Sequence, residues 1–243
     1  MAAGARTIAI IPAYNEEDAL PGVLTELRQT VPDLDVVVVS DGSRDRTAEV
    51  ARGAGVHVVE LPYNLGIGGA LQTGFRFAHR GGWSRAVQVD ADGQHEPGQV
   101  PRLLAALDSG ADLVIGTRFA AAAGYQVGRT RGRAMGAMRV AVRLLSGRRF
   151  SDTSSGFRAF DADMIAFFAD TYPAEYMDSV EALLLALRAG FSVVEVPVTM
   201  RERQAGQPSN RNFRLVYHFI RLAVVMLSGA SRRRRVPVRQ AVP

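Results

Sequence analysis

The chain lacks cysteine and lysine altogether, and its 243 residues include only four histidines and one tryptophan. Without cysteine it can form no disulfide, no cysteine-ligated zinc site and no thiol nucleophile. The histidines lie at positions 57, 79, 95 and 218, which is not the spacing of a metal-binding motif. Residues 1–6 lack the apolar segment of a signal peptide, so we expect a cytoplasmic protein.

Acidic residues are scarce in two segments, and this gives the chain its net charge of +5. Residues 201–243 hold ten arginines and one acidic residue, and residues 119–149 hold seven arginines and no acidic residue. A nucleic acid, an anionic membrane surface or a phosphorylated substrate would each suit such segments. The hydrophobic content of 47% is enough to bury the core of one domain.

Apolar, β-branched runs alternate with helical patterns through the first half of the chain. The predicted strands are residues 7–11, 36–39, 56–61, 85–89 and 112–115, and the predicted helices are residues 16–29, 45–52, 66–79 and 98–107. Continuous apolar strands that alternate with helices predict a mostly parallel α/β sheet of the Rossmann type, with helices on both faces. In such sheets, ligands bind outside the carboxyl ends of the strands.

Polar residues follow three of the predicted strands, at 12–17, 41–45 and 90–92. The third set contains two carboxylates, Asp90 and Asp92, and Gly93 allows the chain to bend there. Like charges this close are costly unless a cation lies between them, and Mg²⁺ or Mn²⁺ usually bridges such oxygens to substrate phosphates. We therefore predict a metal–diphosphate site. A solvated Asp-rich turn is the alternative reading of the pair alone.

The second half is less regular. We predict a basic amphipathic helix over residues 130–146, a polar loop over 151–156, a helix over 178–189, a strand over 191–198 and an Arg-rich loop over 201–210. Residues 211–228 form a helical pattern with a narrow polar stripe on an otherwise apolar surface. This run is too short and too charged to span a membrane, which takes about 20 apolar residues. It suits a membrane interface, or packing on its own domain or on a second subunit.

Taken in order, these motifs resemble the family 2 glycosyltransferases of the GT-A fold, and among them the polyprenyl-phosphate (dolichyl-phosphate) mannose and glucose synthases. The matching segments are 12–17, 40–47, 64–66, 90–95, 116–119, 155–158, and Arg203 with Gly206. The resemblance implies a glycosyltransferase domain over residues 7–210. An amphipathic helix over 211–230 would follow it, with disordered ends at 1–6 and 231–243.

The resemblance also implies roles for individual residues. Asp90 and Asp92 would gather the diphosphate and Mg²⁺ or Mn²⁺, and Gln94 would complete the metal shell. Asp92, Arg118 and Arg203 would act in catalysis, and Arg118, Arg158 and Arg203 would contact the acceptor phosphate. The nucleotide sugar would be bound by Pro12, Tyr14, Glu16, Val39, Asp41, Asp90, Ala91, Asp92 and Arg118.

Several of these positions have a structural alternative. Asn15 or Glu16 could cap the first helix, Asp41 fits a turn, and Asn64 and Gly66 fit the start of the third helix. Arg158 could serve its loop instead of the acceptor. His95 is expected to have a supporting role and not to bind the metal.

The type of acceptor follows from the lack of an obvious general base. A hydroxyl acceptor needs one, whereas a phosphate monoester is already an anionic nucleophile. Asp178 and Glu181 have the spacing of a helix capping box, although a glycosyltransferase acting on a hydroxyl could use either as its base. We therefore favour an inverting transfer of a hexose from a GDP- or UDP-sugar to a polyprenyl phosphate.

The basic segments suggest where the protein works. We expect a peripheral protein on the inner face of the membrane that contacts the bilayer or a membrane-protein partner, and homo-oligomers are compatible with the apolar helix. A nucleic-acid-binding protein is disfavoured, because the Arg-rich segments lack interleaved aromatic residues.

Overall fold

The computed structural model of the chain describes residues 5–117, 129–173 and 178–201. Two of the predicted site residues, Arg118 and Arg203, lie outside these ranges, as do the predicted helix over 211–228 and both predicted disordered ends except residues 5 and 6. No helix within the described part is both long and apolar enough to cross a bilayer.

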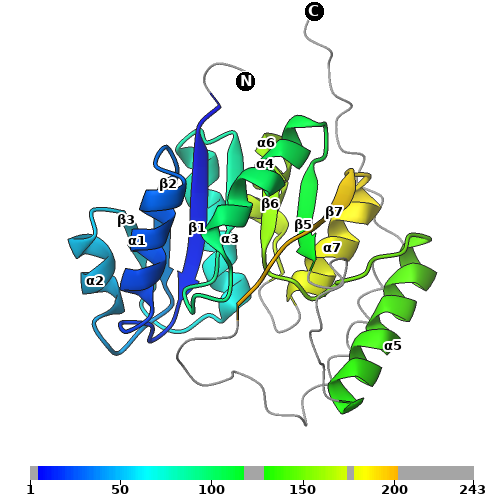
Figure 1. Cartoon of the computed structure of the whole chain (residues 1–243), viewed down its shortest axis with the longest axis horizontal. Helices are drawn as coiled ribbons and strands as arrows, with labels where there is room; N and C mark the ends of the chain where they lie inside the picture. The colour runs from blue at the N-terminus through cyan, green and yellow to red at the C-terminus, as the bar shows by residue number, and fades with distance from the viewer. Residues whose placement is uncertain (1–4, 118–128, 174–177, 202–243) are drawn as a thin grey trace, which may run out of the picture.

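Seven strands form one mixed sheet in the order β3-β2-β1-β4-β6-β5-β7 (Figure 1). All neighbouring strands are parallel except β6, which runs antiparallel to both β4 and β5. The strands are β1 (Thr7–Ala13), β2 (Asp35–Ser40), β3 (His57–Glu60), β4 (Arg85–Gln88), β5 (Leu113–Thr117), β6 (Arg158–Asp161) and β7 (Val193–Pro197). The mostly parallel sheet predicted from the alternation of strands and helices is confirmed.

Helices cover both faces of the sheet because each presents one apolar side to it. Apolar residues of α1, α2 and α4 pack on one face, and those of α3, α5, α6 and α7 pack on the other. The helices are α1 (Leu20–Thr30), α2 (Thr47–Gly53), α3 (Ile67–Arg80), α4 (Val100–Asp108), α5 (Arg129–Ser146), α6 (Ala162–Thr171) and α7 (Asp178–Ala189), and a 3₁₀ turn at Pro97–Gln99 precedes α4.

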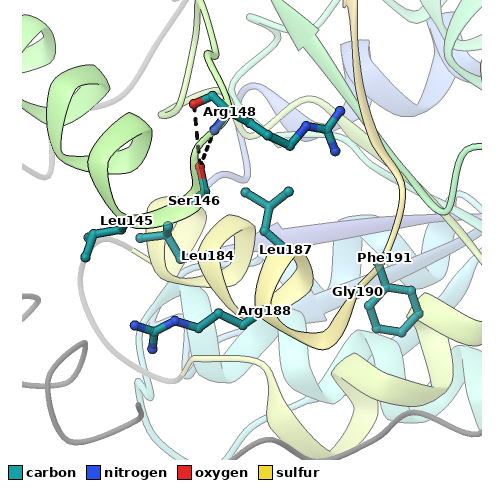
Figure 2. A pocket seen from close by; sticks show the side chains of 8 residues that line it. All are labelled: Leu145, Ser146, Arg148, Leu184, Leu187, Arg188, Gly190 and Phe191. Carbon is teal, nitrogen blue, oxygen red and sulfur yellow. Dashed lines mark hydrogen bonds between the residues drawn. The ribbon is translucent and has the colours of Figure 1, made fainter.

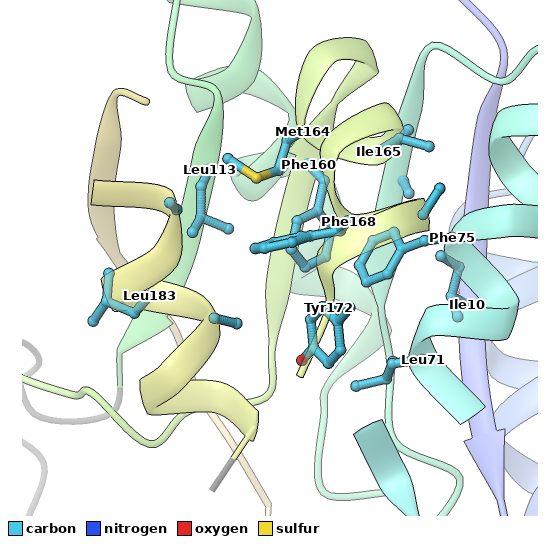
Figure 3. Packing of buried hydrophobic residues seen from close by; sticks show 14 of the residues in the cluster. Ile10, Leu71, Phe75, Leu113, Phe160, Met164, Ile165, Phe168, Tyr172 and Leu183 are labelled. Atoms are coloured by element: carbon cyan, nitrogen blue, oxygen red, sulfur yellow. The ribbon is translucent and has the colours of Figure 1, made fainter. Parts of the chain in front are cut away.

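An aromatic cluster joins α3, α6 and β6 on the second face (Figure 3). The rings of Phe75 and Phe160 meet edge to face at 4.8 Å, and Phe168 lies 5.5 Å from Phe75. Gly74 lets α3 approach β1 closely, since a β-carbon there would lie 2.3 Å from Ile10 Cγ2. This packing ties the antiparallel strand to the parallel half of the sheet.

The first helix begins later than predicted, at Leu20 and not at residue 16. The amides of Glu16 and Glu17 instead donate to side chains of the next βα loop, and Pro21 lies in the first turn of the helix. Neither Asn15 nor Glu16 caps α1, whose N-cap residue is Ala19. The predicted helix over 98–107 also begins late, at Val100, because residues 97–99 form the 3₁₀ turn. The helix over 178–189 has the predicted bounds.

The sequence reading missed β6 and α6. Strand β6 is only four residues long and has charged residues at both ends, so it shows neither an apolar run nor an alternating pattern. Its place in the sheet comes from pairing on both sides, which no local pattern encodes. The predicted strand over 191–198 is shorter, at Val193–Pro197.

Asp161, at the edge of the sheet opposite the predicted site, should make stability depend on pH. Its side chain caps α6 by accepting from Met164 N at 2.8 Å. Burial, together with the nearby carboxylates of Asp112 and Asp163, raises the pKa of Asp161 to about 7. Between about pH 4 and pH 7, Asp161 therefore keeps its proton in the folded protein but loses it in the unfolded chain. The free energy of unfolding should fall as the pH rises through this window.

Asp161→Asn keeps the cap but cannot ionise. We expect it to raise the melting temperature at pH 8 by about 2–4 °C, which corresponds to about 1 kcal/mol once solvent screening is allowed for, and to change it little at pH 5. Asp170→Asn, in the exposed last turn of the same helix, is the control and should keep the wild-type pH dependence. An equal shift of the D161N variant at both pH values would contradict the assignment.

Candidate functional site

The polar segments predicted to form the site meet at one edge of the sheet. The carboxyl ends of β1, β2 and β4 lie at this edge because the three strands are adjacent and parallel. Strand β6 runs the other way, so its first residue, Arg158, pairs with Gln88 at the end of β4. The loop over residues 151–157 is thereby brought to the same edge as Asp90.

The loops that follow β1 and β2 are bound to each other by a row of hydrogen bonds. Tyr14 remains 43% exposed beside this row and is free to stack on a planar ligand. Asn15 takes a left-handed backbone conformation with φ of 54°, which asparagine tolerates. The bonds run from Asn15 N to Ser43 Oγ (3.2 Å), Glu16 N to Thr47 Oγ1 (2.9 Å), Glu17 N to Asp45 Oδ2 (3.1 Å) and Arg44 N to Asn15 Oδ1 (2.8 Å).

Asp41 is only 3% exposed and holds the start of α3. Its two carboxylate oxygens accept from Leu65 N at 2.7 Å and from Gly66 N at 2.9 Å. Burial raises the pKa of Asp41, although these two hydrogen bonds oppose the rise. Gly42 has a φ of 65°, and a β-carbon there would lie 2.6 Å from the backbone of Asn64, so this turn requires glycine.

Gly66 is the N-cap residue of α3, and the Asn64 side chain accepts from its amide at 3.0 Å. These contacts confirm the structural alternative for Asn64 and Gly66. They also give Asp41 a structural role, whatever it contributes to binding.

The segment from Asp90 to His95 forms a tight turn at the centre of the edge. Gly93 has a φ of 78°, which confirms the predicted bend. Asp92 is 8% exposed, and its Oδ1 accepts from Gln94 N at 3.0 Å. The turn therefore keeps both carboxylates and the Gln94 amide within one short loop.

His95 supports this turn from behind, as predicted. It is buried, stacks on Phe157 with ring centroids 4.6 Å apart, and accepts from Asp90 N at Nδ1. Its proton must then lie on Nε2, which is 3.5 Å from Asp90 Oδ2. Both ring nitrogens of His95 thus face Asp90, one at its backbone amide and the other at its carboxylate.

The chain that leaves β7 pairs with the same turn. Met200 forms an antiparallel bridge with His95, and Arg201 N donates to the carbonyl oxygen of Gln94 at 2.9 Å. The Arg201 guanidinium forms two 2.7 Å hydrogen bonds with Glu26 of α1. The backbone on either side of Gln94 is thereby fixed to α1 and to the end of β7.

Two carboxylates and one amide are a chemically suitable set for a hard divalent cation. Asp90 Oδ1 is buried and has no hydrogen-bond partner among the described residues, as expected for an oxygen reserved for a ligand. No group of three His, Asp or Glu side chains gathers for a metal in the described part of the chain. A metal here would therefore depend on Asp90, Asp92, Gln94 and the phosphates of the substrate.

Comparison with known proteins decides the family. The model of "Glycosyl transferase family 2" matches residues 8–169. The chain belongs to glycosyl transferase family 2. The chain is therefore a glycosyltransferase, and the family predicted from its motifs is confirmed.

Two curated relatives cover most of this glycosyltransferase. An undecaprenyl-phosphate mannosyltransferase of Micrococcus luteus is 38% identical over 211 residues, which are 83% of this chain and 86% of the relative. A polyprenol monophosphomannose synthase of Mycolicibacterium smegmatis is 35% identical over 212 residues, which are 83% and 79% of the two chains.

A solved structure shares the fold of the glycosyltransferase. Glucosyl-3-phosphoglycerate synthase from Mycobacterium tuberculosis, in complex with Mn²⁺, UDP and glucosyl-3-phosphoglycerate, aligns with a TM-score of 0.69. It is 22% identical, and the alignment covers 93% of this chain and 79% of that one. This similarity supports the architecture alone.

The fold brings together most of the predicted site residues of the glycosyltransferase. Pro12, Tyr14, Glu16, Asp41 and the whole Asp90–Gln94 turn lie along one edge. The side chain of Val39 has no exposure and packs in the core, so it lies beneath the edge and only its backbone is near.

Arg158 is also fully buried. Its guanidinium donates to the carbonyl oxygens of Ser155 at 2.8 Å and Thr153 at 3.4 Å. These contacts favour the structural alternative for Arg158 over contact with an acceptor phosphate.

A polar cluster next to the site was not predicted. Glu195 on β7 accepts from the amides of Ser151 and Asp152 and from the Ser151 hydroxyl, which also bonds Thr117 at 2.8 Å. The sequence signal was the loop SDTSSG itself, whose small polar residues suit hydrogen bonding to backbone. The acid that anchors it is 44 residues away, on another strand.

A pocket of about 390 Å³ lies away from these residues, between the end of α5 and α7 (Figure 2). Leu145, Leu184, Leu187 and Phe191 line it, and Arg148 donates to Val193 O beside it. It contains none of the predicted site residues.

Proposed function

We propose that this glycosyltransferase moves a hexose from a nucleoside-diphosphate sugar to a polyprenyl phosphate, with inversion at the anomeric carbon and with the aid of Mg²⁺ or Mn²⁺. One observation carries the proposal: the Asp90–Gln94 turn shares a sheet edge with the exposed Tyr14. The residues that would hold a metal and a diphosphate thus lie beside a side chain that would stack on a nucleotide base. The two relatives, a mannosyltransferase that uses undecaprenyl phosphate and a polyprenol monophosphomannose synthase, support the lipid-phosphate acceptor.

Each part of the edge has a task in this reaction. A bound Mg²⁺ or Mn²⁺ would offset the charge that develops on the diphosphate leaving group. Asp90, Asp92 and Gln94 would hold it, and His95 keeps Asp90 oriented. An acceptor phosphate is already anionic and needs no general base. Its attack on the anomeric carbon from the face opposite the leaving group would give inversion.

A hydroxyl acceptor is the second candidate, with Asp178 or Glu181 as base. Helix α7, which carries both, packs against α5 and the core face that also holds α3 and α6. The Asp178 side chain lies outside the described part. The acceptor panel below separates the two candidates directly.

The test is to incubate the protein with GDP- and UDP-hexoses, Mg²⁺ or Mn²⁺, and one acceptor at a time. We expect one donor to be consumed only when a polyprenyl phosphate and a divalent ion are both present, and the product to carry the inverted anomeric linkage by NMR. Transfer to a polyprenol or a soluble sugar, with none to the polyprenyl phosphate, would contradict the proposal.

Helix α5 offers a surface for the membrane that holds such an acceptor, and we place the enzyme on the cytoplasmic face. Val140 and Leu144 lie one turn apart and are 57% and 80% exposed, while Val142 faces the core. The exposed residues Arg139 and Arg143 lie on the same turns. Exposed apolar side chains flanked by arginines suit the interface of an anionic bilayer.

Leu144→Glu should weaken binding to phosphatidylglycerol vesicles by about tenfold, because inserting a leucine gains about 1.5–3 kcal/mol. Vesicle co-sedimentation measures this. Gln29→Glu, an equal charge change in the exposed last turn of α1, is the control and should bind like the wild type. Equal losses in both variants would show that net charge alone matters.

A further inference from the structure

Gln88 is a buried polar side chain that the fold leaves without a partner. It is the last residue of β4 and is 1% exposed. Neither its carboxamide nitrogen nor its carboxamide oxygen has a hydrogen-bond partner among the described residues. Leaving such a group unpaired costs stability, and native structures rarely do so without a water, an ion or a functional reason.

The position of this carboxamide points to the reason. Gly156, in the loop that precedes β6, lies against both Gln88 and Asp90. A β-carbon on Gly156 would be 2.9 Å from Gln88 Nε2 and 3.5 and 3.6 Å from the two oxygens of Asp90. Asp90 Oδ1 is itself buried without a partner in the described part. A donor without a partner, Gln88 Nε2, and an acceptor without a partner, Asp90 Oδ1, therefore both lie next to Gly156 in the described part of the chain.

The other oxygen of Asp90 already faces a side-chain donor, since His95 Nε2 lies 3.5 Å from Oδ2. We propose that Gln88 is a positioning residue for Asp90. Its Nε2 would donate to one buried water, and that water would donate to Asp90 Oδ1. Gln88 and His95 would then hold the carboxylate from its two sides, and neither would neutralise it. A carboxylate that must bind a cation needs support of this kind, because supporting hydrogen bonds to metal ligands set their orientation.

This inference rests on the proposed function, since it assigns Gln88 to the metal–diphosphate site. It also explains why Gln88 occupies a strand position where an apolar residue would pack. A carboxamide that served the fold alone would have its partners within the fold.

The experiment compares Gln88→Met with Val87→Ala by titrating Mn²⁺ in the presence of UDP or GDP, and by thermal unfolding without metal. Methionine fills a similar volume without a polar group, so the melting temperature should stay the same or rise. The Mn²⁺ affinity should fall about 10–100-fold, as it does when a supporting partner of a metal ligand is lost. Gln88→Leu provides a second apolar replacement.

Val87 lies on the opposite face of β4 and is fully buried in the other core cluster. Its truncation should lower the melting temperature and leave the Mn²⁺ affinity unchanged, which is the reverse of the pattern for Gln88. Wild-type affinity in both Gln88 variants would overturn this inference and leave the proposed function standing. A wild-type protein that binds no Mn²⁺ with either nucleotide would overturn both.

Discussion

Replacing Asp92 with Asn should reduce sugar transfer by about 10³-fold, because the variant loses one of the charges that would hold a metal on the diphosphate. Asn is nearly the same size, and its amide oxygen can still accept from Gln94 N, as Asp92 Oδ1 does at 3.0 Å. The turn should therefore keep its shape, so the loss would be one of charge and not of folding.

The rate of donor consumption with a saturating polyprenyl phosphate measures the effect, and a Mn²⁺ titration should show that metal-dependent donor binding is lost with it. Asp108→Asn is the matched control, since Asp108 is a surface acid whose side chain is 62% exposed and paired with Arg85. That control should keep wild-type activity. A D92N variant within tenfold of the wild type would show that Asp92 does not serve the reaction.

Gly156→Ala should lower kcat/KM by about 10²-fold, because a displacement of about 1 Å in a reacting group costs this much. The added methyl group would approach Gln88 Nε2 to 2.9 Å, which is too close, and would lie in van der Waals contact with the two oxygens of Asp90, at 3.5 and 3.6 Å. Gln88 is 1% exposed, so relief must come from moving its buried carboxamide, which we propose supports Asp90, or from moving the loop that holds Gly156. Steady-state kinetics at several Mn²⁺ concentrations should show a higher metal requirement.

Gly22→Ala is the matched control for this substitution. Gly22 lies in α1, and a β-carbon there would meet nothing within 4 Å. Alanine is the better helix former by about 1 kcal/mol, so this variant should be more stable and fully active. If Gly156→Ala were as active as the control, the close packing around Asp90 would have no catalytic importance.

The part of the site that could be predicted from sequence is the part encoded locally. Asp90 and Asp92 follow a buried strand, and the rule that ligands bind at the carboxyl ends of parallel strands placed them beside the loops at 12–17 and 41–45. Each of these features lies within a short segment, so neither pairing partners nor distant residues were needed. The family motifs then supplied the chemistry.

What could not be predicted depends on contacts between distant segments. The family resemblance implied that Arg158 contacts a phosphate, but antiparallel pairing of β6 places it inside the sheet, where it bonds to its own loop. The structural role of Asp41 could not be predicted for the same reason, since its carboxylate accepts from amides 24 and 25 residues further along the chain. Gln88 was read as one more residue of a buried strand, and only the position of Gly156 reveals what lies beside it.

The row of hydrogen bonds between the first two βα loops has a consequence for the energetics of recognition. These loops bind each other through their own amides and side chains, so their shape is set before any nucleotide arrives. Little conformational entropy remains to be lost there when a donor docks. Under the proposed function, discrimination between one base and another would come from the fit to a rigid surface, and a change in Ser43, Asp45 or Thr47 should weaken affinity by loosening the two loops.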